Sequence, residues 1–339
     1  MIFESLYGHK TVKESLGRSL ACDRISNAYV FEGIEGVGKK LCAKLFSQAL
    51  VCEAHTACGV CPMCVQARAS THPDIITLKK DKDRASVGVD NVREQIISEV
   101  YLKPRNAARK IFIIDAGDEL SVEAQNALLK VLEEPPSYVT FIICVTSKEK
   151  LLSTVLSRSQ TVTFFPLSTD EVSQYLTKNY DIEHDSAETI ARLSQGSIGV
   201  ARELCSNPDK QARIEKSINA LINLKKNSLR LREMVEFLTE EKENITEIID
   251  YLMTFLRDCV MVKTNMEESC VFAGRLSDIR VFAADISKKR LISAFDKLSG
   301  LKVSLKQNLN FNATVSEAVM RVWEDFHDKG SGHQIQARR

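Results

Sequence analysis

Short apolar runs alternate with amphipathic stretches through residues 1–165 of the chain. Five apolar runs have the length and composition of buried strands: Ala28–Phe31, Asp74–Leu78, Lys110–Ile114, Tyr138–Thr146 and Gln160–Phe165. Three stretches between them repeat their apolar residues at helical spacing: Leu41–Leu50, Asn91–Val100 and Glu119–Leu132. Strands that alternate with helices are typical of a parallel sheet with crossover helices, so the pattern predicts an α/β domain.

Strand signals fade after Phe165, and helical periodicity continues to about Phe326. Pro166–Asp170 has the composition of a linker with a helix N-cap, and Ser206–Asp209 marks a second boundary. The fold class is therefore α/β followed by all-α, in four parts. These are an α/β domain over residues 1–166, a small helical domain over 167–206, a larger helical domain over 207–326, and a polar, disordered tail over 327–339.

Charge and hydropathy narrow the class of protein. The 339 residues include 46 Lys plus Arg and 45 Asp plus Glu, which gives a formal charge of +1. This balance argues against a protein whose affinity comes mainly from neutralising phosphates, although it leaves room for local basic patches. The longest apolar run, Val139–Val145, is far shorter than the roughly 20 residues of a membrane span, and residues 1–10 contain no signal-peptide core. We expect a cytoplasmic protein with no membrane partner.

A glycine-rich segment follows the first predicted strand. Residues 33–40, Gly-Ile-Glu-Gly-Val-Gly-Lys-Lys, match the phosphate-loop pattern G-x-x-x-x-G-K but lack the Ser or Thr that follows it. Between a strand and a helix, the backbone N–H groups near Gly33, Gly36 and Gly38 can surround phosphates, and Lys39 can contact the β and γ oxygens. The alternative is a glycine-rich turn with no ligand. The flanking strand and helix favour a P-loop, with ATP or ADP as its candidate ligand.

Two catalytic groups of such a site are missing from the sequence. Lys40 stands where a hydroxyl would bind Mg²⁺, and it offers no acceptor. The strand that ends at Asp115 has the form of a Walker B element, so this aspartate could still face a metal. The next residue, Ala116, cannot orient the attacking water, while Asp118 and Glu119 lie at other offsets. We therefore predict a degenerate ATPase that hydrolyses nucleotide poorly or not at all.

Four of the ten cysteines lie close together in the sequence: Cys52, Cys58, Cys61 and Cys64. Four thiolates at short spacing, separated by small and turn-forming residues, suit a tetrahedral zinc ion with no open coordination position. A structural zinc that braces the P-loop domain or a contact with a neighbour is the leading hypothesis. An iron–sulfur cluster and plain free thiols are the alternatives, although the ferredoxin pattern continues with x3-C-P and this segment does not.

The order of motifs resembles that of clamp-loader subunits of the AAA+ class. The resemblance rests on four segments, which span most of the first 205 residues: Ile25–Gly33 with the P-loop and cysteines that follow, Ile111–Leu120, Asn126–Pro136 and Leu156–Ser159. The string Asn-Ala-Leu-Leu-Lys-Val-Leu-Glu-Glu-Pro-Pro is the most specific of them. The later segment Leu305–Asn312 looks like part of the oligomerising collar of this family, with weaker support. The resemblance implies a P-loop domain, a helical lid and a collar.

The same resemblance implies the roles of single residues and partners. Arg158 matches the arginine finger that acts in trans on the ATP site of an adjacent motor subunit. The family motif ends in Cys where this chain has Ser159, and the lid arginine that senses nucleotide is missing from Gly196–Gly199. Implied partners are gamma/tau motor subunits and a delta subunit in a hetero-pentamer. The complex would load the sliding clamp onto primed DNA within the bacterial DNA polymerase III holoenzyme.

Two other functions compete with this one. A catalytically active gamma/tau-like motor subunit would need Asp118 or Glu119 as a substitute carboxylate. A zinc-bearing DNA-binding module would use basic residues near the predicted second strand and after the predicted second crossover helix: Lys79, Lys80, Lys82, Lys103 and Arg105. Nothing in the sequence resembles the two-metal carboxylate site of a polymerase, so polymerase chemistry is not expected of this chain itself.

Overall fold

The computed structural model describes residues 2–78, 86–180, 182–227, 229–305 and 310–327. By their internal contacts they form two compact units, Met1–Ile182 with Ser194–Arg202, and Glu183–Leu193 with Glu203–Arg339. Residues 167–206 are thus shared between the two units, and the predicted division into three folded domains stays a prediction. All but the first residue of the predicted tail lies outside the described residues.

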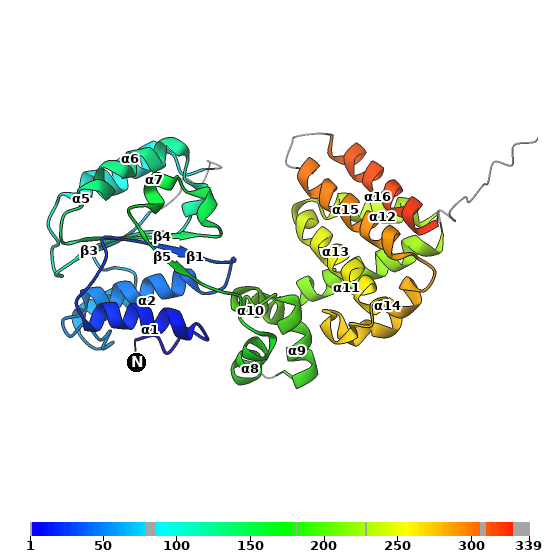
Figure 1. Cartoon of the computed structure of the whole chain (residues 1–339), viewed down its shortest axis with the longest axis horizontal. Coiled ribbons are helices and arrows are strands. Elements are labelled where there is room, and N and C mark those ends of the chain that lie inside the picture. The colour runs from blue at the N-terminus through cyan, green and yellow to red at the C-terminus, as the bar shows by residue number, and fades with distance from the viewer. Residues whose placement is uncertain (1, 79–85, 181, 228, 306–309, 328–339) are drawn as a thin grey trace, which may run out of the picture. The chain divides into compact units, whose positions relative to one another are not determined.

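A five-stranded sheet forms the centre of the first unit, with the strand order β2-β3-β4-β1-β5 (Figure 1). The strands are β1 (Ala28–Glu32), β2 (Ile75–Thr77), β3 (Lys110–Ile114), β4 (Val139–Val145) and β5 (Gln160–Thr163). All four pairings between neighbouring strands are parallel. The five predicted strands and their parallel arrangement are therefore confirmed, with ends that differ by no more than two residues.

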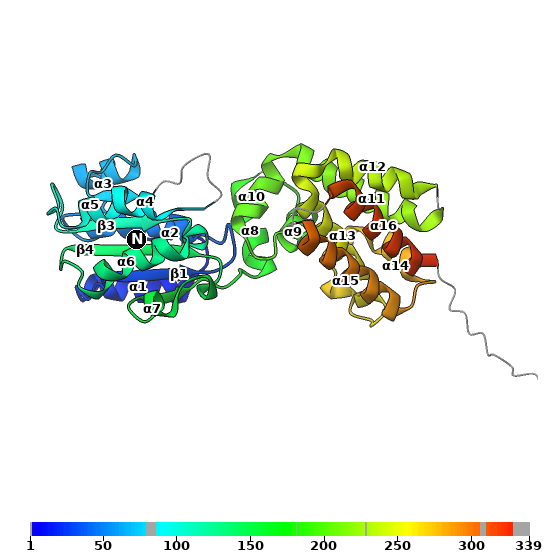
Figure 2. The ribbon, with the colours of Figure 1, turned by 90° about the horizontal axis from the view of Figure 1, so that it is seen from above.

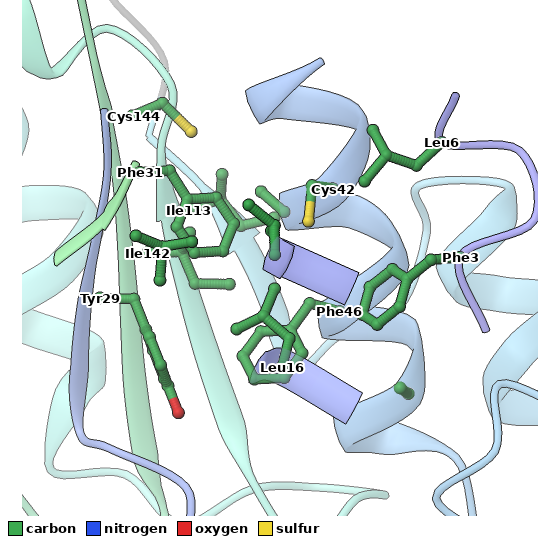
Figure 3. Packing of buried hydrophobic residues seen from close by; sticks show 14 of the residues in the cluster. Phe3, Leu6, Leu16, Tyr29, Phe31, Cys42, Phe46, Ile113, Ile142 and Cys144 are labelled. Atoms are coloured by element: carbon green, nitrogen blue, oxygen red, sulfur yellow. The ribbon is translucent and has the colours of Figure 1, made fainter. Parts of the chain in front are cut away.

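Successive side chains of each strand point to opposite faces of the sheet, so the core has two layers. In β1, Tyr29 and Phe31 pack with α1 and α2 on one face, and Val30 packs with α6 on the other. Figure 3 shows the first layer, in which Phe46 of α2 lies against Tyr29. The helices of this unit are α1 (Lys10–Ala21), α2 (Lys39–Val51), α3 (Pro62–Arg68), α4 (Val89–Val92), α5 (Ser98–Val100), α6 (Val122–Glu133), α7 (Ser153–Leu156), α8 (Thr169–Asn179) and α10 (Ile198–Ser206). Both faces of the sheet are covered, as a parallel sheet requires.

Two predicted helices differ from the helices of the structure. The stretch Asn91–Val100 is helical, but the π-helical turn Arg93–Ile97 separates α4 from α5. The stretch Glu119–Leu132 contains the end of a 3₁₀ turn, Gly117–Glu119, and then α6. The reason for the later start of α6 is local, because the Ser121 side chain accepts a hydrogen bond from the Ala124 N–H and caps the helix.

Helices make up the second unit. They are α9 (His184–Leu193), α11 (Pro208–Lys226), α12 (Arg230–Glu240), α13 (Ile245–Val262), α14 (Leu276–Ala283), α15 (Lys288–Ser304) and α16 (Phe311–His327). α13 packs against α11, α14 and α15 (Figure 2). Phe282 lies edge-on to both Phe255 and Phe326 in the core of this unit, which joins three helices through aromatic contacts. The predicted all-helical second half is confirmed, and no helix in the described ranges could cross a membrane.

Candidate functional site: a modified phosphate loop, a cysteine cluster and an arginine

The glycine-rich segment forms the turn between β1 and α2. Gly36 and Gly38 have φ angles of 71° and 118°, a region that favours glycine. A Cβ atom on Gly33 would lie 2.5 Å from the Phe164 carbonyl oxygen, so the loop also passes too close to the chain after β5 for a side chain. The turn thus lies between a strand and a helix, as the sequence predicted, and binding of nucleotide by it stays a prediction.

Lys39 folds back over the loop. Its Nζ donates hydrogen bonds to the carbonyl oxygens of Gly33 at 2.5 Å and Ile34 at 2.9 Å. Burial lowers the pKa of this ammonium, while nearby acidic groups, Asp118 and Asp115 among them, act in the opposite direction. In this structure the amine is thus bonded to the loop's own carbonyl oxygens, and it would have to leave them to contact a phosphate.

Lys40 makes an ion pair with Asp115, which comes from the end of β3, 75 residues later in the chain. The two side chains are 61% and 30% exposed. In an active P-loop ATPase this aspartate helps to hold Mg²⁺. In this chain its carboxylate is instead neutralised by a lysine ammonium, so one residue both removes the metal-binding hydroxyl and covers the metal-binding carboxylate.

The acidic residues beyond Ala116 have other contacts. Both carboxylate oxygens of Asp118 accept the Thr146 N–H, at 2.9 Å each, and Lys150 Nζ lies 3.6 Å away. Asp118 thus fastens the end of β4 to the turn after β3. The backbone of Glu119 accepts the Val87 N–H at 2.9 Å. Both residues line the nucleotide pocket, but the contacts of Asp118 show a carboxylate occupied by the protein itself.

The pocket above the loop has a volume of about 870 Å³ and is formed within the first unit alone. It brings together the predicted residues Gly36, Gly38, Lys39, Lys40 and Asp115. Gly33 is part of the same turn. The pocket is also lined by residues that the sequence analysis missed, among them Tyr7, Lys44, Tyr175 and Arg202. Lys44 follows Lys40 by one helical turn, so helical periodicity could have indicated it, whereas no sequence signal places the two tyrosines there.

Arg202 is the cation of α10 that lines the pocket. It follows Gly199 by three residues, which is about one helical turn. Its Nε donates to the Tyr180 hydroxyl at 3.4 Å, and this contact together with Tyr175 raises the pKa of the guanidinium. The segment Gly196–Gly199 contains no arginine, but Arg202 of α10 brings a guanidinium to this pocket.

A close approach of two backbones explains why position 199 is glycine. The Gly199 N–H donates to the Gly36 carbonyl at 2.9 Å, and the Ser197 hydroxyl donates to the Glu35 carbonyl at 2.8 Å. A Cβ atom on Gly199 would lie 2.7 Å from the Gly36 Cα atom. No side chain fits between α10 and the P-loop, so a nucleotide-sensing arginine could not stand at position 199 in this structure.

We expect Gly199→Ala to destabilise the chain by about 1–3 kcal/mol, because the added methyl group must push two backbone segments apart. Gly17→Ala is the matched control. Gly17 lies within α1, and a Cβ atom there meets nothing within 4 Å, so this change should stabilise the helix by about 0.5–1 kcal/mol. Urea unfolding followed by far-ultraviolet circular dichroism measures both. Equal effects of the two changes would contradict the close contact.

The four cysteine sulfurs cluster between α2 and α3. Cys52, Cys58, Cys61 and Cys64 place their Sγ atoms within 4.8 Å of one another. The Cys58 and Cys64 sulfurs are 3.9 Å apart, and two sulfurs bound to one tetrahedral zinc are separated by about 3.8 Å. The N–H groups of Cys61 and Cys64 donate to the sulfurs of Cys58 and Cys61, at 3.4 Å each. The cluster can hold a metal ion.

The protonation of these thiols also suits a cation. Burial opposes ionisation of Cys52, yet backbone N–H groups of Cys58, Ala54 and Thr56 bring the pKa of its thiol down to about 6. N–H donors of Cys61 and Val60 lower the pKa of Cys58 as well, whereas burial raises the pKa of Cys64 to about 12. Backbone N–H groups thus lower the pKa of two of the thiols, and a dication would favour loss of the proton from Cys64.

Arg158 lies just beyond the end of α7, on the surface of the first unit. Its Nη1 donates to the Thr154 carbonyl at 3.0 Å and to the Ser157 hydroxyl at 3.2 Å, and its Nη2 lies 2.9 Å from Glu133 Oε1. The Ser159 hydroxyl donates to the Val155 carbonyl at 2.9 Å, which stabilises the turn after α7. The guanidinium is partly exposed, is held by three contacts, and is not among the residues that line this chain's own pocket.

The basic residues of the DNA-binding alternative receive little support. Lys79, Lys80 and Lys82 lie outside the described residues. Lys103 and Arg105 are exposed, and the N–H of Arg105 donates to the buried carboxylate of Asp74 at 2.7 Å, which orders this loop. Two exposed cations on a loop are common in proteins that bind no nucleic acid, so this alternative stays a prediction.

Comparison with protein families gives matches over both units. The family model of the DNA polymerase III delta subunit matches residues 8–168. The model of the C-terminal part of the DNA polymerase III delta subunit matches residues 208–316. The P-loop, the cysteine cluster and Arg158 all lie within the first match, and most of the second helical unit lies within the other.

Curated relatives agree with these matches. The delta' subunit of DNA polymerase III from Bacillus subtilis is 25% identical over 92% of this chain and 95% of that protein. The delta' subunit from Escherichia coli is 32% identical over 59% of this chain and 60% of that protein. The tau subunit from Bacillus subtilis is 32% identical over 60% of this chain and 37% of that protein. The chain spans about a third of the length of the tau and gamma/tau relatives.

Proposed function

This chain belongs to the delta-prime family of DNA polymerase III subunits, of the AAA+ clamp-loader class, and on that premise we propose that it is a subunit that does not hydrolyse ATP. In the assembled loader it presents Arg158 to the nucleotide site of a neighbouring motor subunit. The loader places a sliding clamp on primed DNA, and this chain contributes structure and one catalytic guanidinium.

The ion pair between Lys40 and Asp115 is the observation that most directly supports the absence of hydrolysis. Phosphoryl transfer needs a metal ion, a positioned water and charge stabilisation at the same time. The ammonium of Lys40 lies where it opposes a second cation at Asp115, and Ala116 has no carboxylate to orient water. Without a bound metal ion and a positioned water, the pocket could still hold a nucleotide but would not hydrolyse it.

The proposed partners follow from the family. The similarity to the tau relative covers 60% of this chain, and the similarity to delta' from Bacillus subtilis covers 92% of it and so extends into both units. We propose that gamma/tau motor subunits and a delta subunit complete a hetero-pentamer with this chain. The second helical unit would form its share of the oligomerising collar.

Zinc is the metal that we propose for the cysteine cluster. Four thiolate ligands, no open position and a sulfur separation near 3.9 Å suit a structural zinc ion. When bound, the ion would cross-link the segment after α2 to α3. Ala57, Met63 and Ala67 of this segment pack against the core that contains α1 and α2. The metal would therefore hold a surface insertion against the P-loop domain, and it would take no part in chemistry.

We expect the purified chain alone to show no ATP turnover with Mg²⁺, whether or not it binds nucleotide. The reason is that Lys40 and Ala116 replace the groups that hold the metal and the water. ATP binding by titration and multiple-turnover hydrolysis measure the two properties separately. Lys39→Ala, prepared in parallel, identifies contaminating activity, because such activity persists in this variant. Turnover that disappears in Lys39→Ala would instead identify the chain as a motor subunit with an unusual site.

A further inference from the structure

We propose that Glu133 is the positioning residue of Arg158, and that it holds the guanidinium ready for a phosphate of the neighbouring subunit. This inference rests on the proposed role of Arg158 in trans and extends it by one residue. Glu133 does not itself touch nucleotide in this proposal. It acts through Arg158, by fixing where the guanidinium lies and which of its N–H groups face outward.

Two elements from different parts of the chain meet at this ion pair. Glu133 is the last residue of α6; Glu134 and then Pro135 and Pro136 follow, and the prolines disfavour any continuation of the helix. Arg158 follows α7 by two residues, and α6 packs against α7. Glu133 Oε1 lies 2.9 Å from Arg158 Nη2. The carboxylate therefore comes from the end of a long helix, and it contacts a side chain of the turn that follows a short one.

The contacts of Arg158 use only part of its hydrogen-bonding capacity. A guanidinium has five N–H groups. Nη1 donates hydrogen bonds to Thr154 and Ser157, Nη2 forms an ion pair with Glu133, and Nε has no acceptor among the described residues. Glu133 contributes one oxygen to one nitrogen, which is less than the two parallel contacts of a bidentate pair. Donors thus remain for phosphate oxygens while the side chain keeps one orientation.

Exposure favours a positioning role over a permanent ion pair. Arg158 and Glu133 are 35% and 51% exposed, and an ion pair this exposed contributes little to folding stability. A phosphate oxygen can therefore compete for the guanidinium at small cost. The ion pair limits the rotamers of the Arg158 side chain before the neighbouring subunit binds. This reduces the conformational entropy that the side chain loses when it enters the neighbour's nucleotide site.

The neighbouring residue Glu134 is a matched control. It has the same charge and is also exposed, and its side chain makes no hydrogen bond or ion pair with the described residues. Replacing either glutamate by alanine changes the net charge equally. A difference between Glu133→Ala and Glu134→Ala therefore reports the contact with Arg158 and not the general electrostatic field.

The test uses the loader assembled from this chain and its gamma/tau and delta partners, with ATPase measured in the presence of clamp and primed DNA. We expect Glu133→Ala to lower the single-turnover rate of ATP hydrolysis at the neighbouring subunit's site about three- to tenfold, with the ATP concentration for half-maximal rate within twofold, because misplacing a catalytic group slows chemistry more than binding. Glu133→Gln keeps an oxygen acceptor and should retain most activity. Glu134→Ala should equal the unchanged protein. Circular dichroism and gel filtration verify folding and assembly, and Glu133→Gln continues the test if Glu133→Ala fails to assemble.

Arg158→Ala and the double variant with Glu133→Ala separate the possible results. If Arg158→Ala leaves the ATPase unchanged, the proposed function is wrong. If Arg158→Ala lowers it but Glu133→Ala equals Glu134→Ala, only the role of Glu133 is wrong. A rise of activity in Glu133→Ala would mean that the carboxylate restrains the finger, which also overturns the proposal. In the Arg158→Ala background, Glu133→Ala should cause no further loss; an undiminished loss there would show that Glu133 acts elsewhere.

Discussion

Arg158→Ala should lower single-turnover ATP hydrolysis at the neighbouring subunit's site by about 10³-fold or more, because an arginine finger stabilises charge on the transferring phosphoryl group. The steady-state rate of the whole loader should fall less, since its other nucleotide sites keep their own fingers. The change removes a partly exposed side chain and no core contact, so the complex should stay assembled. Rapid-quench hydrolysis with clamp and primed DNA measures the effect.

Two further variants make this result specific. Arg158→Lys keeps the positive charge but loses the planar fork, so it should recover only part of the rate. Arg18→Ala removes an exposed arginine of α1, for which the described residues offer one weak contact, with the Glu14 carbonyl, and it should have no effect. Unchanged hydrolysis in an intact Arg158→Ala loader would eliminate the finger role.

Cys58→Ser should remove the metal and disorder the segment between α2 and α3. Loss of a structural metal is one of the few single changes that cost more than about 4 kcal/mol, although the separate core of the P-loop domain limits how far unfolding spreads. We expect the purified chain to contain one zinc per molecule and Cys58→Ser to contain almost none. Elemental analysis together with thermal unfolding measures both properties.

Cys22→Ser is the control for the cysteine prediction, because Cys22 is exposed and is not part of the cluster. It should keep the zinc and the unfolding temperature. Iron in place of zinc would support the iron–sulfur alternative. A metal-free protein with unchanged stability, purified without chelators, would show that the four residues are plain thiols.

Local patterns in the sequence determined the secondary structure and showed which catalytic groups of a P-loop site are missing. The strands of the sheet were predictable because short apolar runs that alternate with helical stretches are typical of a parallel sheet with crossover helices. The absence of a hydroxyl at position 40 and of a carboxylate at position 116 is a matter of residue identity, so no structure was needed to notice it. The spacing of the four cysteines likewise limits how far apart they can lie, and the sulfurs do cluster.

Only the tertiary structure decided how distant residues meet. Lys40 pairs with Asp115 because α2 begins at the same sheet edge where β3 ends. Gly199 is glycine because α10 approaches the P-loop backbone, and Arg202 lines the pocket because α10 turns it there. The contact of Glu133 with Arg158 depends on the packing of α6 against α7. Periodicity determines which face of an element is buried, but the side chains that meet across elements depend on the distances and angles at which those elements pack.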